Sequence, residues 1–314
     1  MASLNKTLRN KGKKTNSTTL ANGEFKKVRK PKPTSKSESD ANKFQKVSQG
    51  LASDGSEMKG VIAFNSFGKN IMRELRRCYP EPVLLLGSTG WGKSVICREV
   101  SRVMGKDYIS INAHPGMDMG LLVGMWRPQS RDGSGIEVVW EDGLLTKAIR
   151  NGAVFFFEEL TRAPQEAVSR LHGVLDSANR YWSLPEAGED NVPVHKDFWF
   201  IATANPPRAG YGAQRIEKAL QSRFIAQFEI DEPMAEELAV VQSILDDETL
   251  ALKLMRVMED ARRHGDTQVP TRDLVQWAVM VKKGFAVDRA FELAVTPKFP
   301  EKKDGLRKIV YAHF

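Results

Sequence analysis

The stretch from Pro82 to Ser94 constrains the fold of this chain more than any other. Val83 to Leu86 is a short apolar run, typical of a buried parallel strand. It is followed by Gly87-Ser88-Thr89-Gly90-Trp91-Gly92-Lys93-Ser94, which has the spacing G-x-x-x-x-G-K-S, and then by an amphipathic segment from Ile96 to Val103. A strand, a glycine-rich loop and a helix in this order are typical of a phosphate-binding site.

The residue types in this loop suit a nucleotide. The glycines allow backbone N–H groups to turn towards phosphate oxygens, and the N-terminus of the following helix favours an anion. Lys93 supplies a positive charge for the β- and γ-phosphates, and the Ser94 hydroxyl can bind Mg²⁺. We therefore predict that residues 87–94 bind ATP with Mg²⁺. The alternative, a plain glycine-rich turn with a surface lysine, does not require the complete pattern or its flanking elements.

Two further apolar strands are predicted to end in polar side chains. One runs from Ala153 and ends at Glu158 and Glu159, and the other runs from Phe198 to Thr203 and Asn205. Ligands of open α/β sheets bind at the carboxyl ends of the strands. Glu158 is therefore expected to hold Mg²⁺, Glu159 to activate the attacking water, and Asn205 to position it. The alternatives are a solvated strand end for the glutamates and a turn-forming asparagine before a proline.

Arginine side chains are candidates for binding the transferred phosphoryl group. Arg223 lies near the end of a short predicted helix, and a guanidinium there can act in its own subunit or in a neighbour. Arg215 is a weaker candidate for the same role. Arg272 lies at a predicted helix start, where Thr271 is expected to be the N-cap, and it can reach a nucleotide from a helical lid. For each arginine, the alternative is an ordinary surface side chain.

The pattern of elements predicts three parts. Residues 1–55 are rich in Lys, Ser, Thr and Asn and lack hydrophobic periodicity, so we expect a disordered basic tail. Residues 56–231 alternate strands and helices and predict an α/β domain with a parallel sheet and flanking helices. Residues 232–314 read as helical and predict a small all-α lid domain. Cys78 and Cys97 are expected to be buried thiols in a reducing compartment.

The positive charge of the chain is concentrated in the tail. The first 50 residues hold 13 of the 47 Lys and Arg residues but only 3 of the 39 Asp and Glu residues. The cluster Lys26–Lys32 suits a nuclear localisation signal, a nucleic-acid contact or a partner tether, and a merely solubilising tail is the alternative. No apolar run is long enough to span a bilayer, so we expect no membrane contact and a cytoplasmic protein, or a nuclear one in a eukaryote.

Two excursions interrupt the alternation of strands and helices. Residues 127–135 look turn-rich and precede a strand at 136–140, and residues 181–195 predict a hairpin with a polar turn at 188–191.

These segments jointly resemble the AAA+ ATPases, and within them the MoxR-like group, over roughly residues 60–285. The matching segments are Gly87–Ser94 (Walker A), Glu141–Ala148 with Phe155–Pro164 (Walker B), Ala202–Pro206 (sensor 1), Leu220–Phe224 (arginine finger) and Pro270–Leu274 (sensor 2). The segment Asp142–Leu145 resembles in particular the subgroup that acts beside rubisco, nitric oxide reductase or cobalt chelatase. The resemblance implies the P-loop NTPase fold and a homo-hexameric ring.

The resemblance also implies roles for single residues. It makes Glu159 the catalytic base, Asn205 the first sensor, Arg223 an arginine finger acting on the neighbouring subunit, and Arg272 the second sensor. Residues 125–140 resemble the helix-2 insert of the group and residues 181–197 its pre-sensor hairpin, both of which usually face the pore. The implied client is a protein, often one with a von Willebrand factor A domain.

The chain departs from the family pattern at Glu158, where the family usually has aspartate. The additional methylene moves the carboxylate outward at a site where Mg²⁺ requires octahedral geometry. Three functions follow from the sequence. The favoured one is an ATP-hydrolysing motor that remodels or activates a protein partner. The others are a nucleic-acid-associated ATPase that uses its basic tail, and a slowly hydrolysing scaffold gated by nucleotide.

Overall fold

A five-stranded parallel sheet with the order β2-β5-β8-β1-β9 forms the centre of the fold. Its strands are β1 (Val83–Gly87), β2 (Tyr108–Asn112), β5 (Val154–Glu158), β8 (Trp199–Ala204) and β9 (Ala226–Ile230). The computed structural model describes residues 64–131, 135–205, 216–264 and 267–314. The parallel pairing confirms the α/β class predicted from the sequence.

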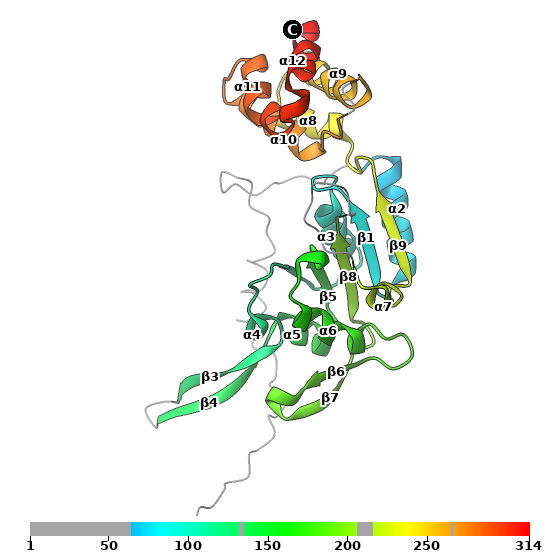
Figure 1. Cartoon of the computed structure of the whole chain (residues 1–314), viewed down its shortest axis with the longest axis vertical. Helices are drawn as coiled ribbons and strands as arrows, with labels where there is room; N and C mark the ends of the chain where they lie inside the picture. Colours follow the sequence, from blue (N-terminus) through cyan, green and yellow to red (C-terminus); the bar gives the residue numbers. More distant parts are fainter. Residues whose placement is uncertain (1–63, 132–134, 206–215, 265–266) are drawn as a thin grey trace, which may run out of the picture. The chain divides into compact units, whose positions relative to one another are not determined.

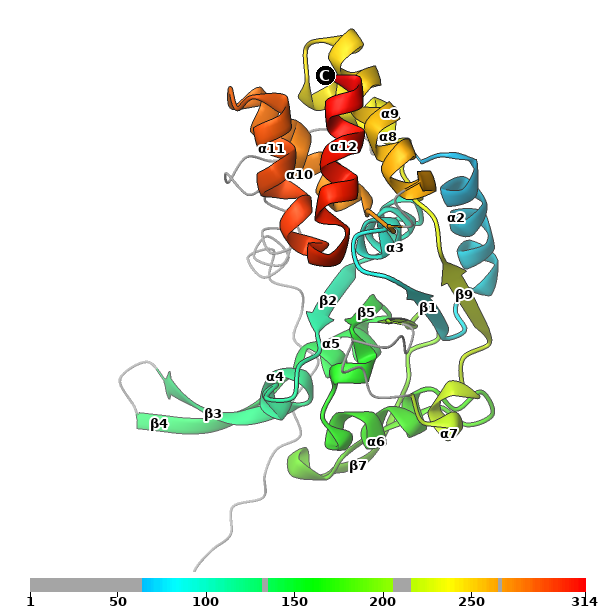
Figure 2. The same cartoon turned by 45° about the horizontal axis from the view of Figure 1, so that its top comes forward.

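Helices cover both faces of this sheet. On one face, α2 (Ser66–Cys78) and α3 (Lys93–Val103) pack against it, and α2 runs alongside β9 (Figures 1 and 2). On the other face lie α5 (Leu144–Asn151) and α6 (Gln165–Val174). The central strands β1, β5 and β8 are buried almost throughout and apolar on both sides, whereas the edge strands β2 and β9 expose Ser110, Gln227 and Glu229.

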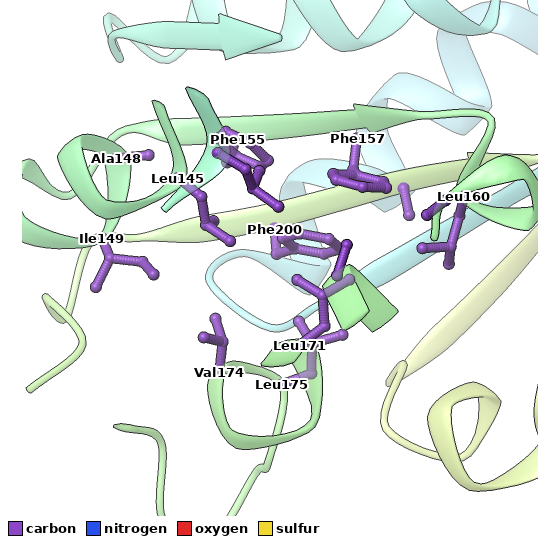
Figure 3. Packing of buried hydrophobic residues seen from close by; sticks show 14 of the residues in the cluster. Leu145, Ala148, Ile149, Phe155, Phe157, Leu160, Leu171, Val174, Leu175 and Phe200 are labelled. Carbon is purple, nitrogen blue, oxygen red and sulfur yellow. The ribbon is translucent and has the colours of Figure 1, made fainter. Parts of the chain in front are cut away.

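Phenylalanine rings fill the face of the sheet that α5 and α6 cover (Figure 3). The rings of Phe155 and Phe157 in β5 and of Phe200 in β8 form a triangle, with centroids 6.2 Å (155–157), 6.0 Å (155–200) and 6.1 Å (157–200) apart. Leu171 and Val174 of α6 approach these rings from the opposite side (Figure 3). This layer fixes the strand β5 that carries Glu158 at its end.

Two antiparallel hairpins stand outside the sheet. The first, β3 (Gly124–Arg131) and β4 (Gly135–Asp142), follows the short helix α4 (Met119–Leu122) and extends away from the sheet (Figures 1 and 2). The second consists of β6 (Tyr181–Leu184) and β7 (Glu189–Pro193).

Both hairpins correct details of the sequence prediction. Residues 124–131 form a strand, where 127–135 were expected to be turns, because pairing with β4 supplies the backbone hydrogen bonds that a polar segment needs. In the second hairpin, the chain reverses in a 3₁₀ turn at Pro185–Ala187 and at Gly188, whose φ is 74°. Residues 189–191, expected to be part of the turn, belong to β7.

The hairpins are joined by polar contacts. The indole N–H of Trp126 in β3 donates to the carbonyl oxygen of Glu186, 2.9 Å away, beside β6. Arg150 of α5 forms ion pairs with Asp142 at the end of β4 (2.9 Å) and with Glu189 at the start of β7 (2.8 Å). The two hairpins and α5 therefore form one connected group.

The segment after the sheet is helical, as predicted. It contains α8 (Glu237–Ile244), α9 (Glu248–His264), α10 (Thr271–Lys282), α11 (Val287–Ala294) and α12 (Lys303–His313), with two 3₁₀ turns, Thr296–Lys298 and Pro300–Lys302. These helices enclose a hydrophobic core of their own, which includes Trp277 and Phe291. Within the described ranges, no helix is both long and apolar enough to cross a lipid bilayer.

Several sequence predictions concern single positions. Cys97 is buried, as expected, whereas Cys78 is only partly buried because it is the last residue of α2. The short helix α7 (Lys218–Gln221) and a 3₁₀ turn, Leu160–Arg162, complete the secondary structure. The predicted basic tail, residues 1–55, lies outside the described residues, as does Arg215.

Candidate nucleotide site

The carboxyl ends of β1, β5 and β8 open onto one cavity of about 620 Å³. Polar side chains from the loop after β1 and from the other two strand ends line one part of it, and apolar side chains line the rest. The polar and glycine lining residues are Thr89, Gly90, Gly92, Lys93, Ser94, Asn112, Glu158, Glu159, Thr203, Asn205, Ser243, Thr271 and Arg272. The structure thus brings together, at one site, most of the side chains that the sequence singled out.

Two glycines give the loop between β1 and α3 its path. Gly90 and Gly92 have φ angles of 91° and 100°, a region that side-chain-bearing residues rarely adopt. A Cβ atom at Gly90 would also lie 2.8 Å from the Cβ of Pro270. The loop therefore requires glycine at both positions, and its last glycine directly precedes the first turn of α3.

Lys93 is held at the base of the loop by backbone oxygens. Its Nζ donates to the carbonyl oxygens of Gly87 and Ser88, each 2.7 Å away. Burial, and then the positive charge of Arg272, lower the pKa of the Lys93 ammonium from 10.5 to about 8. An anion in the cavity would offset both effects, because a negative charge nearby favours the protonated form.

Ser94 and Glu158 meet across the loop. The Ser94 hydroxyl donates to Glu158 Oε2 at 2.6 Å, so two hard oxygen ligands already face one another. Mg²⁺ in nucleotide sites is held by one or two such protein oxygens together with phosphate oxygens and water. No cluster of three or more His, Cys, Asp or Glu residues that could hold a metal ion occurs in the described part of the chain. The residues present therefore fit Mg²⁺ bound with a nucleotide.

Glu159 has an unusual backbone. Its φ of 56° is the only positive one among the non-glycine residues that the structure describes. Its N–H donates to the Thr203 hydroxyl at the end of β8, 3.1 Å away. Its carboxylate pairs with Arg162, whose Nη1 lies 2.6 Å from Oε2. Such backbone outliers are enriched at functional sites.

The three remaining candidates have different surroundings. Asn205 and Arg272 line the cavity, and their predicted roles stay predictions. Arg223 does not line it: its guanidinium donates to the carbonyl oxygens of His172 (3.2 Å) and Ala219 (2.6 Å). Arg223 is therefore not placed to contact the cavity of its own chain in this structure.

The cavity also contains residues that sequence reasoning missed. Its apolar part is lined by Trp91, which belongs to the predicted loop, and by residues that the sequence did not single out, namely Phe64, Val95, Met234, Ala235, Ala239, Val240, Ile244 and Val275. An isolated bridge between Phe64 and Ala235 closes this part, and no sequence pattern links two positions so far apart. Asn112, by contrast, ends β2 beside Glu158, so the rule that ligands bind at strand ends could have found it.

One sequence prediction at this site is wrong. Thr271 is not the N-cap of α10, because Pro270 takes that position and Thr271 is the first helical residue. The Thr271 hydroxyl instead donates to Glu237 Oε1 in α8, 2.6 Å away. A hydrogen bond to a charged carboxylate is stronger than one between neutral groups, so this contact ties the start of α10 to α8.

Comparison with known proteins finds one matching domain family and several similar proteins. Residues 82–224 match the AAA domain of the dynein-related subfamily. NorQ from Paracoccus denitrificans (strain Pd 1222) is 31% identical over 245 residues, which are 74% of this chain and 86% of NorQ. CbbQ from Hydrogenophilus thermoluteolus is 31% identical over 221 residues, 68% of this chain and 79% of CbbQ. Midasin from Dictyostelium discoideum is 28% identical over 210 residues, which are 63% of this chain but 3% of midasin.

The fold, the loop and these matches define a AAA domain of the P-loop class. The chain belongs to the AAA+ ATPases, in the MoxR-like group.

Proposed function

We propose that this protein binds ATP with Mg²⁺, hydrolyses it, and uses the cycle to remodel or activate a protein partner from a ring of identical subunits. The observation that carries the proposal is the meeting of Lys93, the Ser94–Glu158 pair and Glu159 at the edge of one cavity. Membership of the MoxR-like AAA+ group supports it.

Each side chain has a part in the proposed reaction. Lys93 and the loop amides bind the phosphates, and Ser94 with Glu158 holds the metal ion, which neutralises charge on the phosphates. Glu159 accepts the proton of the attacking water, and Asn205 orients that water. The apolar part of the cavity takes the base.

Arginines complete the proposed site. Arg272 contributes charge from the helical lid, residues 232–314, and Arg223 acts on the nucleotide of a neighbouring subunit. The proposed client is a protein, and proteins that carry a von Willebrand factor A domain are the first candidates.

The test compares wild-type protein with Lys93→Ala and Glu159→Gln for nucleotide affinity and for phosphate release. We expect Lys93→Ala to lose nucleotide binding, because the phosphates lose their main positive charge. Glu159→Gln should bind ATP normally and release phosphate at least about a hundredfold more slowly, the usual contribution of a general base. Unchanged ATP affinity in Lys93→Ala would contradict the loop assignment, and wild-type turnover in Glu159→Gln would place the base elsewhere.

A nucleotide-gated scaffold with slow hydrolysis is the second candidate. Two observations favour it: Glu158 replaces the usual aspartate, and the Glu159 carboxylate is paired with Arg162. Glu158→Asp separates the two functions. A wild type that hydrolyses ATP very slowly, together with faster hydrolysis in Glu158→Asp, would support the scaffold. Rapid ATP hydrolysis by the wild type would support the motor.

A further inference from the structure

The tryptophan of the phosphate-binding loop packs beneath an arginine from the helical region. Trp91 is 3% exposed, and the guanidinium carbon of Arg262 in α9 lies 5.4 Å from the centroid of its ring. A guanidinium over an indole face is attracted by the negative potential of that face, more strongly when the pair is shielded from water. Trp91 thus does more than fill space in the loop.

Arg262 is fixed from its other side by a buried carboxylate. Its Nη1 and Nη2 donate to the two oxygens of Glu237 in α8, at 2.6 and 2.8 Å, and its Nε donates to the Val269 carbonyl oxygen at 2.8 Å. Glu237 is 6% exposed. A two-pronged arginine–carboxylate pair is directional, so the plane of the guanidinium is set.

The same carboxylate reaches the helix that carries Arg272. Glu237 Oε1 also accepts the hydroxyl of Thr271, the first residue of α10, at 2.6 Å. Arg272 is the next residue and lines the cavity. The chain of contacts therefore runs from Trp91 through Arg262 and Glu237 to the start of α10.

The loop and the start of α10 also touch directly. A Cβ atom at Gly90 would lie 2.8 Å from the Pro270 Cβ and 3.3 Å from the Arg272 Cβ. The charge of Arg272 is felt at Lys93, where it helps to lower the pKa. Movement of α10 away from the loop would therefore change the charge in the phosphate end of the cavity.

We infer that Trp91 and Arg262 are positioning residues that hold the start of α10, and with it Arg272, against the phosphate-binding loop. The inference rests on the proposed nucleotide binding at this site. Arg272 then adds to nucleotide affinity only while the contact between Trp91 and Arg262 is intact. A purely structural contact would instead stabilise the helical region without any dependence on Arg272.

The experiment is a double-mutant cycle on the full chain. Calorimetry measures the affinity of each variant for a non-hydrolysable ATP analogue in the presence of Mg²⁺. Trp91→Leu removes the aromatic face but keeps an apolar side chain, and it leaves the pair between Arg262 and Glu237 intact. Trp91→Phe is the matched control, because it keeps a ring. Each is measured with Arg272 present and in the Arg272→Ala background.

We expect Trp91→Leu to weaken binding of the analogue about tenfold and Trp91→Phe by less than about threefold, in keeping with a shielded cation–π contact. In the Arg272→Ala background, Trp91→Leu should weaken binding of the analogue less than about twofold, because the arginine that Trp91 helps to position is absent. Equal losses in both backgrounds would overturn the inference, as would no loss from Trp91→Leu.

A second measurement follows the helix itself. In Trp91→Leu, the amides of residues 271–275 should exchange with solvent faster than in the wild type, whereas those of α12 should not change. Unchanged exchange at 271–275 would also overturn the inference. If the wild type does not bind the analogue, the proposed function and this inference are both overturned. If the wild type binds it but the losses of affinity in Trp91→Leu and Arg272→Ala are additive, only the inference is overturned.

Discussion

At the scale of single residues, Glu159 and its neighbours decide how the proposed site would work. The backbone of Glu159 is held in its left-handed conformation by the bond from its N–H to Thr203, and its carboxylate is held by Arg162. The carboxylate of this cavity-lining residue is therefore engaged by an arginine. For Glu159 to act as a base, this ion pair has to open.

Removing Arg162 should therefore speed the reaction. The side chains of Arg162 and Glu159 are 53% and 28% exposed, and an exposed ion pair is worth about 0.2–1 kcal/mol, so Arg162→Ala should raise the turnover number by up to about fivefold. Steady-state phosphate release at saturating ATP measures this. Arg162→Lys, which keeps the charge, is the control and should stay near wild type. A fall in turnover in Arg162→Ala would show that the arginine assists the reaction.

The lowered pKa of Lys93 makes nucleotide binding depend on pH. Because burial and Arg272 hold that pKa at about 8 in the free protein, Lys93 loses its charge as the pH rises through 8, before an ordinary lysine would. Bound phosphates favour the charged form, so affinity is full below pH 8 and falls as the pH rises above it.

This is tested by the affinity for ADP without Mg²⁺ between pH 7 and 9.5. We expect affinity to fall by up to about tenfold for each pH unit above 8. Lys93→Arg keeps its proton over this range and should show a flatter profile. Identical profiles for Lys93→Arg and the wild type would assign the pH dependence to another group.

At the scale of elements, β5 determines where the candidate carboxylates Glu158 and Glu159 lie, and β8 determines where Thr203 and Asn205 lie. Both strands are buried on both faces, and their phenylalanine rings form the layer against α5 and α6 (Figure 3). The hairpin β3–β4 shows the opposite case, since it lies outside the sheet and exposes Ile136 and Val138. The central sheet strands were predicted well because burial on both faces requires continuous apolar runs, whereas the exposed polar strand β3 has no comparable signal.

The aromatic layer can be tested at Phe200, which is 1% exposed and contacts both Phe155 and Phe157. Phe200→Ala should lower the free energy of unfolding by about 3–5 kcal/mol, because it leaves a cavity in a packed core. Urea unfolding measures the change. Phe200→Leu keeps most of the volume and should cost distinctly less, and equal losses in the two variants would mean that ring volume does not matter there.

At the scale of the whole molecule, the contacts of the Arg223 side chain are relevant to how copies of the chain would assemble. Its guanidinium is bound to backbone oxygens and is not among the residues that line the cavity of its own chain. The role proposed for Arg223 is therefore to contact a nucleotide across an interface between copies. Ring assembly, with one interface type repeated around an axis, supplies such an interface.

Mixing two inactive variants tests this arrangement. Arg223→Ala and Glu159→Gln should each be nearly inactive, but in mixed rings about a quarter of the interfaces combine an intact Glu159 with an intact Arg223 from the neighbour. ATP hydrolysis by the mixture should therefore recover to a substantial part of wild type. A mixture that sediments as mixed rings and remains inactive would contradict a role for Arg223 in the neighbouring subunit.

Much of the candidate site follows from local sequence alone. The loop Gly87–Ser94 is recognisable because its glycines, lysine and serine are contiguous and are flanked by a strand and a helix. Glu158 and Glu159 are recognisable because they end an apolar run. The split between residues 56–231 and 232–314 stays a prediction, supported by a separate hydrophobic core among the last helices.

The tertiary structure decided which distant residues complete the site. The sequence determined the phosphate-binding loop, the parallel strands and the two glutamates, because each depends on neighbours a few positions away. Only folding brings Phe64 beside Ala235, Thr203 to Glu159, and Arg262 over the ring of Trp91. Contacts between residues distant in the chain depend on how helices and strands pack, and no spacing in a single sequence records that.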